Sequence, residues 1–189
     1  MKNTALLIID MQNDFVLEGA PMQVQGGLGI IDNVKRVLQL FREKQFPVVH
    51  VIRSHDASGD DVEITRKDIF SKTPFTVPGT SGIEVVDALQ PLPGEKVIEK
   101  KRMSGFFDTA LDSMLRSLGV EAVVVVGVQT PNCVRATAFD AVAYNYETYL
   151  VEDATAAQTP EVHSSNVLDM KDIGINVITV TDVEELLGS

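Results

Sequence analysis

Three side chains capable of acid–base or nucleophilic chemistry stand close to the ends of short apolar runs. Asp10 closes the apolar run 5–9, Lys100 closes another short run, and Cys133 follows the apolar stretch 122–128. A carboxylate base can take the proton of a thiol, and an ammonium group nearby stabilises the resulting thiolate. These three residues therefore predict a cysteine nucleophile that attacks a carbonyl carbon.

Each of these residues also has an ordinary structural interpretation. Asp10 could cap a loop, Lys100 begins a Lys-Lys-Arg run typical of a solvated turn, and a lone cysteine often packs as a small hydrophobe. The surroundings of Cys133 favour chemistry, because Thr130 is a candidate N-cap and Pro131 suits a first helical position. That register places the thiol in a first helical turn, where free N–H groups favour a thiolate and can hold an oxyanion.

The elements that must position these residues follow from the hydrophobic pattern. Apolar runs separated by helical stretches predict a parallel sheet that helices cover on both sides. Sites in such sheets form beyond the carboxyl ends of the strands. We therefore expect one doubly wound, Rossmann-like α/β domain over residues 1–189, with a six-stranded, mostly parallel sheet. The expected strands are 5–9, 48–52, 96–99, 122–126, 148–151 and 177–180, and the clearest expected helices cover 30–41, 111–118 and the residues after Cys133.

The long connection 54–82 shows no extended regular pattern, although residues 63–70 predict a short helix. Connections of this length are commonly functional or disordered. Phe70, Phe75 and Pro78 indicate packing, so the connection is interpreted as a lid or a subunit interface, with a functionless insertion as the alternative. The apolar residues of this connection also favour a homo-oligomer.

Composition excludes several classes of function. The net charge of −11 disfavours contact with nucleic acid or an anionic membrane surface. A single cysteine cannot form an internal disulfide, the apolar run 5–9 is too short for a signal peptide, and 122–128 is too short to cross a membrane. A reducing cytoplasm is the expected compartment, and no membrane or nucleic-acid partner is expected.

Three separated blocks of the sequence resemble the isochorismatase-like cysteine hydrolases. Residues 6–15 are similar to a strand-one motif that ends D-x-Q-x-D-F, and residues 100–106 to K-x-R-x-S-A-F. Residues 127–134 are similar to G-V-x-T-x-x-C-V, and the 33 residues from Lys100 to Cys133 match the family spacing. The resemblance covers nearly the whole chain. Each block alone is weak, but three blocks in order are specific.

The resemblance implies a catalytic triad of Asp10, Lys100 and Cys133 in a Rossmann-like sheet. It also implies a cis peptide bond between Val128 and Gln129, which directs the N–H groups of Gln129 and Cys133 into an oxyanion hole. The motif register assigns catalysis to the first of the two adjacent lysines, so Lys101 is expected to be a solvated neighbour.

Departures from the family pattern refine these expectations. Gly105 replaces the usual Ala, and its context is more similar to the ureide-cleaving branch, such as ureidoacrylate amidohydrolase, than to nicotinamidases. Nicotinamidases carry an Asp-x-His metal motif, whereas the matching stretch here is Arg53-Ser54-His55. No metal and no organic cofactor are therefore expected. Phe15 and Arg53 are expected to bind substrate, His55 is a further candidate, His50 is expected in the core and His163 on a helix surface.

The sequence thus predicts hydrolysis of a C–N bond in a small amide or ureide through a thioester on Cys133. An alternative within the family is a vinyl-ether hydrolase that uses Asp10 as a proton donor and needs no thiol. A second alternative is a protein that uses this fold only for assembly. The thiol at a helix start favours the amidase, whereas a redox sensor is disfavoured because the chain has no resolving cysteine.

Overall fold

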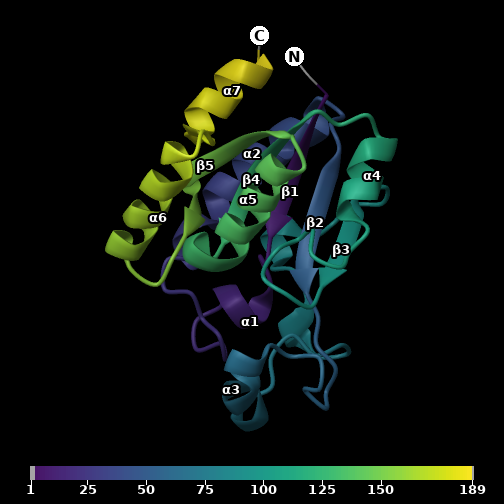
Figure 1. Cartoon of the computed structure of the whole chain (residues 1–189), viewed down its shortest axis with the longest axis vertical. Coiled ribbons are helices and arrows are strands. Elements are labelled where there is room, and N and C mark those ends of the chain that lie inside the picture. Colours follow the sequence, from purple (N-terminus) through teal and green to yellow (C-terminus); the bar gives the residue numbers. More distant parts are fainter. Residues whose placement is uncertain (1–2, 189) are drawn as a thin grey trace.

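The computed structural model describes residues 3–188 and shows a single α/β domain built on one parallel sheet (Figure 1). All five strand pairings are parallel, and the strand order is β3-β2-β1-β4-β5-β6, as expected for a doubly wound sheet. The strands are β1 (Thr4–Ile9), β2 (Val48–Arg53), β3 (Lys96–Lys100), β4 (Ala122–Val128), β5 (Glu147–Ala156) and β6 (Asn176–Ile178).

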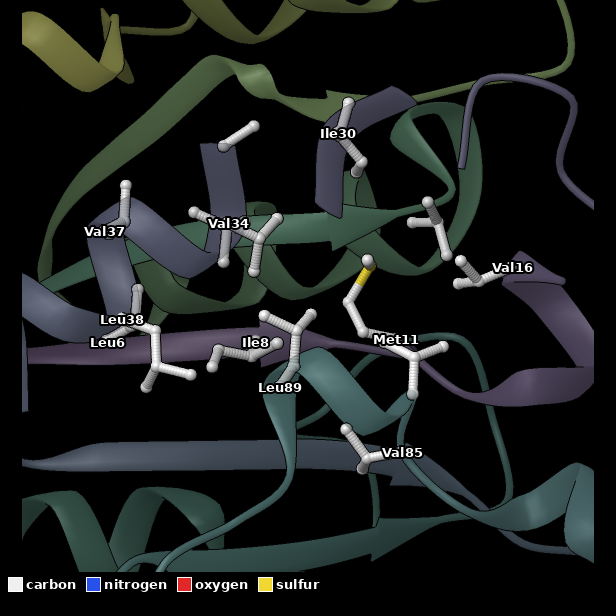
Figure 2. Packing of buried hydrophobic residues seen from close by; sticks show 14 of the residues in the cluster. Leu6, Ile8, Met11, Val16, Ile30, Val34, Val37, Leu38, Val85 and Leu89 are labelled. Carbon is white, nitrogen blue, oxygen red and sulfur yellow. The ribbon is translucent and has the colours of Figure 1, made fainter. Parts of the chain in front are cut away.

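Helices cover both faces of the sheet, which confirms the predicted fold class. The buried residues of β1 alternate between two clusters, with Leu6 and Ile8 facing α2 and α7 and with Leu7 and Ile9 facing α4, α5 and α6. Figure 2 shows the first cluster, where residues of α2 lie over Leu6 and Ile8. The helices are α1 (Asn13–Val16), α2 (Ile31–Glu43), α3 (Lys67–Lys72), α4 (Leu111–Ser117), α5 (Arg135–Ala143), α6 (Pro160–Asp172) and α7 (Val180–Gly188).

Burial explains why some strands were easier to predict than others. β1 and β4 are buried along their whole length, and both lie in the middle of the sheet. β3 forms one edge and is largely exposed, so its three charged residues fit an edge strand and not a strand buried on both faces.

The predicted sixth strand is wrong at its end. β6 stops at Ile178, and Val180 begins α7. The backbone N–H of Thr179 donates to Asp182 (2.7 Å), and the N–H of Asp182 donates to the Thr179 hydroxyl (3.3 Å). This reciprocal capping starts a helix where the apolar pattern alone indicated a strand.

Residues 54–82 of the connection between β2 and β3 lie beyond the carboxyl ends of the strands, next to α1 and at the lower end of the molecule in Figure 1. The rest of the connection runs back along the sheet, where Leu89 lies in the cluster of Leu6 and Ile8 (Figure 2). The short helix expected at 63–70 is divided into a 3-10 turn, Ile64–Arg66, and α3. Further 3-10 turns are Leu28–Ile30, Ser81–Ile83 and Asp87–Leu89. Within residues 3–188, no helix is long and apolar enough to cross a bilayer.

Candidate active site

Asp10 and Lys100 form a buried ion pair at the carboxyl end of the sheet. Asp10 directly follows β1, and Lys100 is the last residue of β3. Lys100 Nζ donates to Asp10 Oδ2 at 2.8 Å, and both residues are at most 2% exposed. Asp10 Oδ1 is buried and has no hydrogen-bond partner among the described residues. One carboxylate oxygen is therefore fixed by the ammonium group, and the other is available as a proton acceptor.

Cys133 lies in a short π-helical turn, Thr130–Val134, that follows β4 and leads into α5. Cys133 is buried, with 5% of its surface exposed. The peptide bond between Val128 and Gln129 is cis, which confirms that implication of the resemblance. The predicted cap is wrong by one residue, because Gln129 is the N-cap and Thr130 already belongs to the turn. The Gln129 carbonyl accepts hydrogen bonds from the N–H groups of Asn132 (3.0 Å) and Val134 (3.2 Å), which fixes the start of the turn.

Arg53 closes β2, the strand between β1 and β3, and its side chain is fully buried behind the thiol. Its Nη2 donates to Cys133 Sγ at 3.2 Å, and its Nη1 pairs with Glu63. Burial alone would lower the pKa of Arg53, but the negative charges of Cys133, Asp10 and Glu63 hold that pKa above its ordinary value. The site thus contains a second cation in direct contact with the Cys133 thiol.

Gln12 holds the backbone of Arg53 in place. Its side-chain Oε1 accepts from the Arg53 N–H (2.7 Å), and its Nε2 donates to the carbonyls of Arg53 (2.8 Å) and Ile83 (2.8 Å). The Gln12 side chain is fully buried. It therefore links the end of β2 to the 3-10 turn Ser81–Ile83 of the β2–β3 connection, and its two hydrogen bonds with Arg53 are buried.

His55 lies beside this group but contacts acids and aromatic rings. Its Nδ1 is 3.3 Å from Asp61 Oδ1, and its ring packs edge-on against Phe70 and Phe75. Burial and the charge of Arg53 lower the pKa of His55 to about 4. His55 is therefore neutral near pH 7. The predicted position of Lys101 is confirmed, since its side chain is 42% exposed and pairs with Asp61.

Asp10 and Cys133 line one narrow pocket. Phe15 lies on its wall as the sequence predicts, whereas Arg53 lies behind the thiol and not on the wall. Sequence reasoning missed Glu63, although a buried Arg needs a carboxylate partner. It also missed Arg66, which reaches this pocket from the β2–β3 connection. The rest of the wall consists of Met22, Val24, Val128, Gln129, Asn132 and Arg66.

The other histidines have structural contacts. His50 is buried in β2, as expected, with its Nε2 3.0 Å from Glu95 Oε2. His163 is half-buried on α6, and its Nδ1 lies 2.9 Å from the Thr130 hydroxyl. The expectation of a plain surface position for His163 is therefore wrong. Within residues 3–188, no group of three or more His, Cys, Asp or Glu side chains is arranged to hold a metal ion.

Comparisons with known proteins match this chain over nearly its whole length. A family model described as the isochorismatase domain matches residues 4–182. The crystal structure of an isochorismatase family protein from Desulfovibrio vulgaris superposes with a TM-score of 0.96 at 42% identity, covering 100% of both chains. A ureidoacrylate amidohydrolase of Agrobacterium fabrum is 32% identical over 95% of this chain and 87% of its own length.

A further relative differs in its assigned activity. A protein of Arabidopsis thaliana named a probable inactive nicotinamidase is 48% identical over 99% of this chain and 97% of its own length. The similar proteins thus include an amide-cleaving enzyme and a protein named as inactive towards an amide. The chemistry of this chain therefore has to be argued from its own residues.

Proposed function

This chain belongs to the isochorismatase family, and from that premise we propose that it is a cysteine amidohydrolase that cleaves the C–N bond of a small amide or ureide. The observation that carries the proposal is the shared pocket of Asp10 and Cys133. In this pocket the buried Cys133 thiol contacts Arg53, and the buried Asp10 carboxylate contacts Lys100 through one oxygen while its other oxygen has no hydrogen-bond partner among the described residues. The name of the Agrobacterium relative supports amide chemistry on this fold.

The first half of the proposed cycle forms a thioester. Asp10 Oδ1 takes the thiol proton, while Lys100 donates a hydrogen bond to Oδ2 and holds the carboxylate in place. The thiolate, stabilised by Arg53, attacks the carbonyl carbon, and a C–S bond forms as the carbonyl π electrons move to oxygen. The oxyanion collapses, the C–N bond breaks, and Asp10 returns its proton to the leaving nitrogen.

The second half releases the acid. Asp10 takes a proton from water, and the resulting hydroxide attacks the thioester carbonyl. The C–S bond then breaks, and Asp10 returns its proton to the departing sulfur, which gives a carboxylic or carbamic acid and the free thiol. We propose that the N–H groups of Gln129 and Cys133 bind the oxyanion in both halves. Removing one such donor costs roughly 100- to 1000-fold in rate in comparable enzymes, so the geometry of the turn matters as much as the triad.

Two other functions remain as alternatives. A vinyl-ether hydrolase would use Asp10 as an acid and would not acylate Cys133, which leaves the Arg53–thiol contact without a role. A non-catalytic protein is favoured by one observation, the 48% identity to a relative named as probably lacking nicotinamidase activity. That name concerns nicotinamide, and it says nothing of turnover of ureides.

A trapping experiment tests the proposed function. The protein is incubated with a panel of small amides and ureides, and ammonia release is measured with and without hydroxylamine. We expect hydroxamate to form at the expense of the acid, and mass spectrometry of a rapidly quenched reaction to find the acyl group on the peptide that contains Cys133. Cys133→Ala is the matched control and should give neither product.

The outcomes separate the alternatives. Turnover that continues with Cys133 blocked and that yields no hydroxamate would replace the amidase by acid catalysis through Asp10. An absence of turnover with every amide and ureide of the panel would favour the non-catalytic protein.

A further inference from the structure

Arg66 brings a positive charge to the pocket of the proposed nucleophile. It ends the 3-10 turn Ile64–Arg66 and lines the same narrow pocket as Asp10 and Cys133. Its side chain is partly exposed, and it makes no hydrogen bond or ion pair with another side chain within residues 3–188. The backbone N–H of Arg66 donates to the carbonyl of Glu63 at 2.8 Å, which fixes the turn that carries it.

The other charges near the pocket are already paired. Asp10 is the single carboxylate on the wall, and Lys100 neutralises it at 2.8 Å. Arg53 is neutralised by Glu63 and lies behind the thiol. Among the described residues, the guanidinium of Arg66 lines this pocket and forms no ion pair with an acid.

The remaining wall suits the body of a small organic anion. Phe15 and Met22 offer apolar surface, whereas the side chains of Gln129 and Asn132 offer neutral hydrogen-bonding groups. A guanidinium binds a carboxylate through two parallel charge-assisted hydrogen bonds, which fixes the orientation of the ligand. An anion held by Arg66 would lie in the pocket that Cys133 also lines.

We propose that Arg66 binds a carboxylate of the substrate, so that the substrates are short amides or ureides that also carry a carboxylate group. Half-amides of dicarboxylic acids and N-carbamoyl amino acids belong to this class. The inference rests on the proposed function for the reaction, but the binding of the carboxylate is a separate property of Arg66. It also gives the β2–β3 connection a role, since that connection supplies the residue that selects the substrate.

A structural role for Arg66 is the simplest competing explanation. Glu63 interacts electrostatically with Arg66, yet its carboxylate is paired with Arg53, and Arg53 contributes more than Arg66 to the lowered pKa of Glu63. A purely structural arginine would affect charged and uncharged substrates alike. A carboxylate-binding arginine would affect only the charged ones.

Matched pairs of substrates test the proposal. Succinamate is compared with butyramide, and N-carbamoylglycine with ethylurea, because in each pair a methyl group replaces the carboxylate. We expect the carboxylate-bearing member to be preferred in kcat/KM, and Arg66→Gln to reduce that preference by roughly 10- to 100-fold, mainly through KM. Arg66→Lys should restore part of the preference. Lys67→Gln removes the same charge from the next, exposed position and should leave the preference unchanged.

Binding without turnover separates this inference from the proposed function. Isothermal titration calorimetry with Cys133→Ala should detect succinamate more strongly than butyramide, and adding Arg66→Gln should abolish the difference. If no amide is hydrolysed but this binding difference is found, the reaction is wrong and the carboxylate site stands. If amides are hydrolysed but Arg66→Gln alters neither binding nor preference, the carboxylate site is wrong and the amidase stands. Equal binding of both compounds to Cys133→Ala would also overturn it.

Discussion

Arg53 places a permanent positive charge against a thiol in a fully buried position. Lys100 does the same for the Asp10 carboxylate. In the proposed cycle, a proton that moves from the thiol to Asp10 moves between two groups that each have a cation at hydrogen-bond distance. Both cations are in place before substrate binds, so they need not reorient when charge develops on sulfur.

The triad residues and their exposed neighbour give the first prediction. We expect Cys133→Ala, Asp10→Asn and Lys100→Ala each to reduce kcat by at least about 1000-fold, because each removes a group that acts together with the others. Lys101→Ala should retain activity, since Lys101 points to Asp61 at the surface. Steady-state rates of ammonia release measure both effects. If Lys101→Ala were inactive and Lys100→Ala were active, our assignment of the catalytic lysine to Lys100 would be wrong.

The second prediction at this scale concerns metal. A guanidinium occupies the position where a metal-binding carboxylate is expected in nicotinamidases, and residues 3–188 hold no group of three ligating side chains. We expect activity to survive dialysis against EDTA or 1,10-phenanthroline and to be unchanged by added zinc. Loss of activity on chelation, followed by recovery when zinc or iron is added, would contradict this prediction. Adding metal back to the chelated protein is the control, because it distinguishes metal loss from nonspecific inactivation by the chelator.

At the scale of elements, the site depends on a close approach between β1 and β4. Gly127 has φ of +108°, and a Cβ atom there would lie 2.2 Å from the Ile9 carbonyl oxygen. No side chain fits this gap, so the end of β4 can lie against β1 only with glycine at this position. The turn that carries Cys133 begins three residues later. The placement of the thiol relative to Asp10 thus depends on a residue without a side chain.

The third prediction follows from this contact. Gly127→Ala should lower the free energy of unfolding by roughly 3 kcal/mol or more, because it adds backbone strain and a steric clash. The change is measured by urea unfolding, together with residual activity. Gly29→Ala is the matched control, since Gly29 is exposed and has no atom within 4 Å of the added Cβ. Equal free energies of unfolding for the two variants would show that β4 can move away from β1 at Gly127 without a loss of stability.

The same elements show what a sequence can predict. The central strands, and the position of Asp10, Lys100 and Cys133 at one end of the sheet, were predictable because continuous apolar runs specify buried strands, and parallel strands bring their carboxyl ends together. The end of β6 was mispredicted because Thr179 and Asp182 form a cap that outweighs the apolar pattern. The contacts of Arg53 with Glu63 and of Gln12 with Ile83 were not predictable, because they depend on the path of the β2–β3 connection.

At the scale of the whole molecule, the three histidines share one property. Burial lowers the pKa of His50, His55 and His163 below the ordinary value of 6.5, although each lies in a different part of the fold. His50 joins β2 to Glu95, and His163 joins α6 to the turn of Cys133. The folded protein therefore resists protonation at three sites that the unfolded chain protonates freely.

This property predicts that stability falls with mild acidification. Below pH 6.5 the unfolded chain binds more protons than the folded chain, so the free energy of unfolding decreases as the pH drops. For His55, whose pKa is lowered to about 4 by burial and by Arg53 despite nearby Asp61 and Glu63, the loss between pH 7 and pH 5 is about 2 kcal/mol. Most carboxylates stay ionised over this range, so relief of the net negative charge contributes little.

Urea unfolding at pH 7, 6 and 5 measures the effect, with the transition slope checked for constancy. We expect the free energy of unfolding to fall steadily, and His55→Gln to reduce the difference between pH 7 and pH 5 by about 2 kcal/mol, whatever its effect on absolute stability. Comparing differences between pH values within one variant separates titration from lost packing, because the substitution removes the same contacts at every pH. A stability that stays flat or rises towards pH 5 would mean that the folded protein accepts these protons, and that His55 is less shielded from water than its contacts with Phe70 and Phe75 indicate.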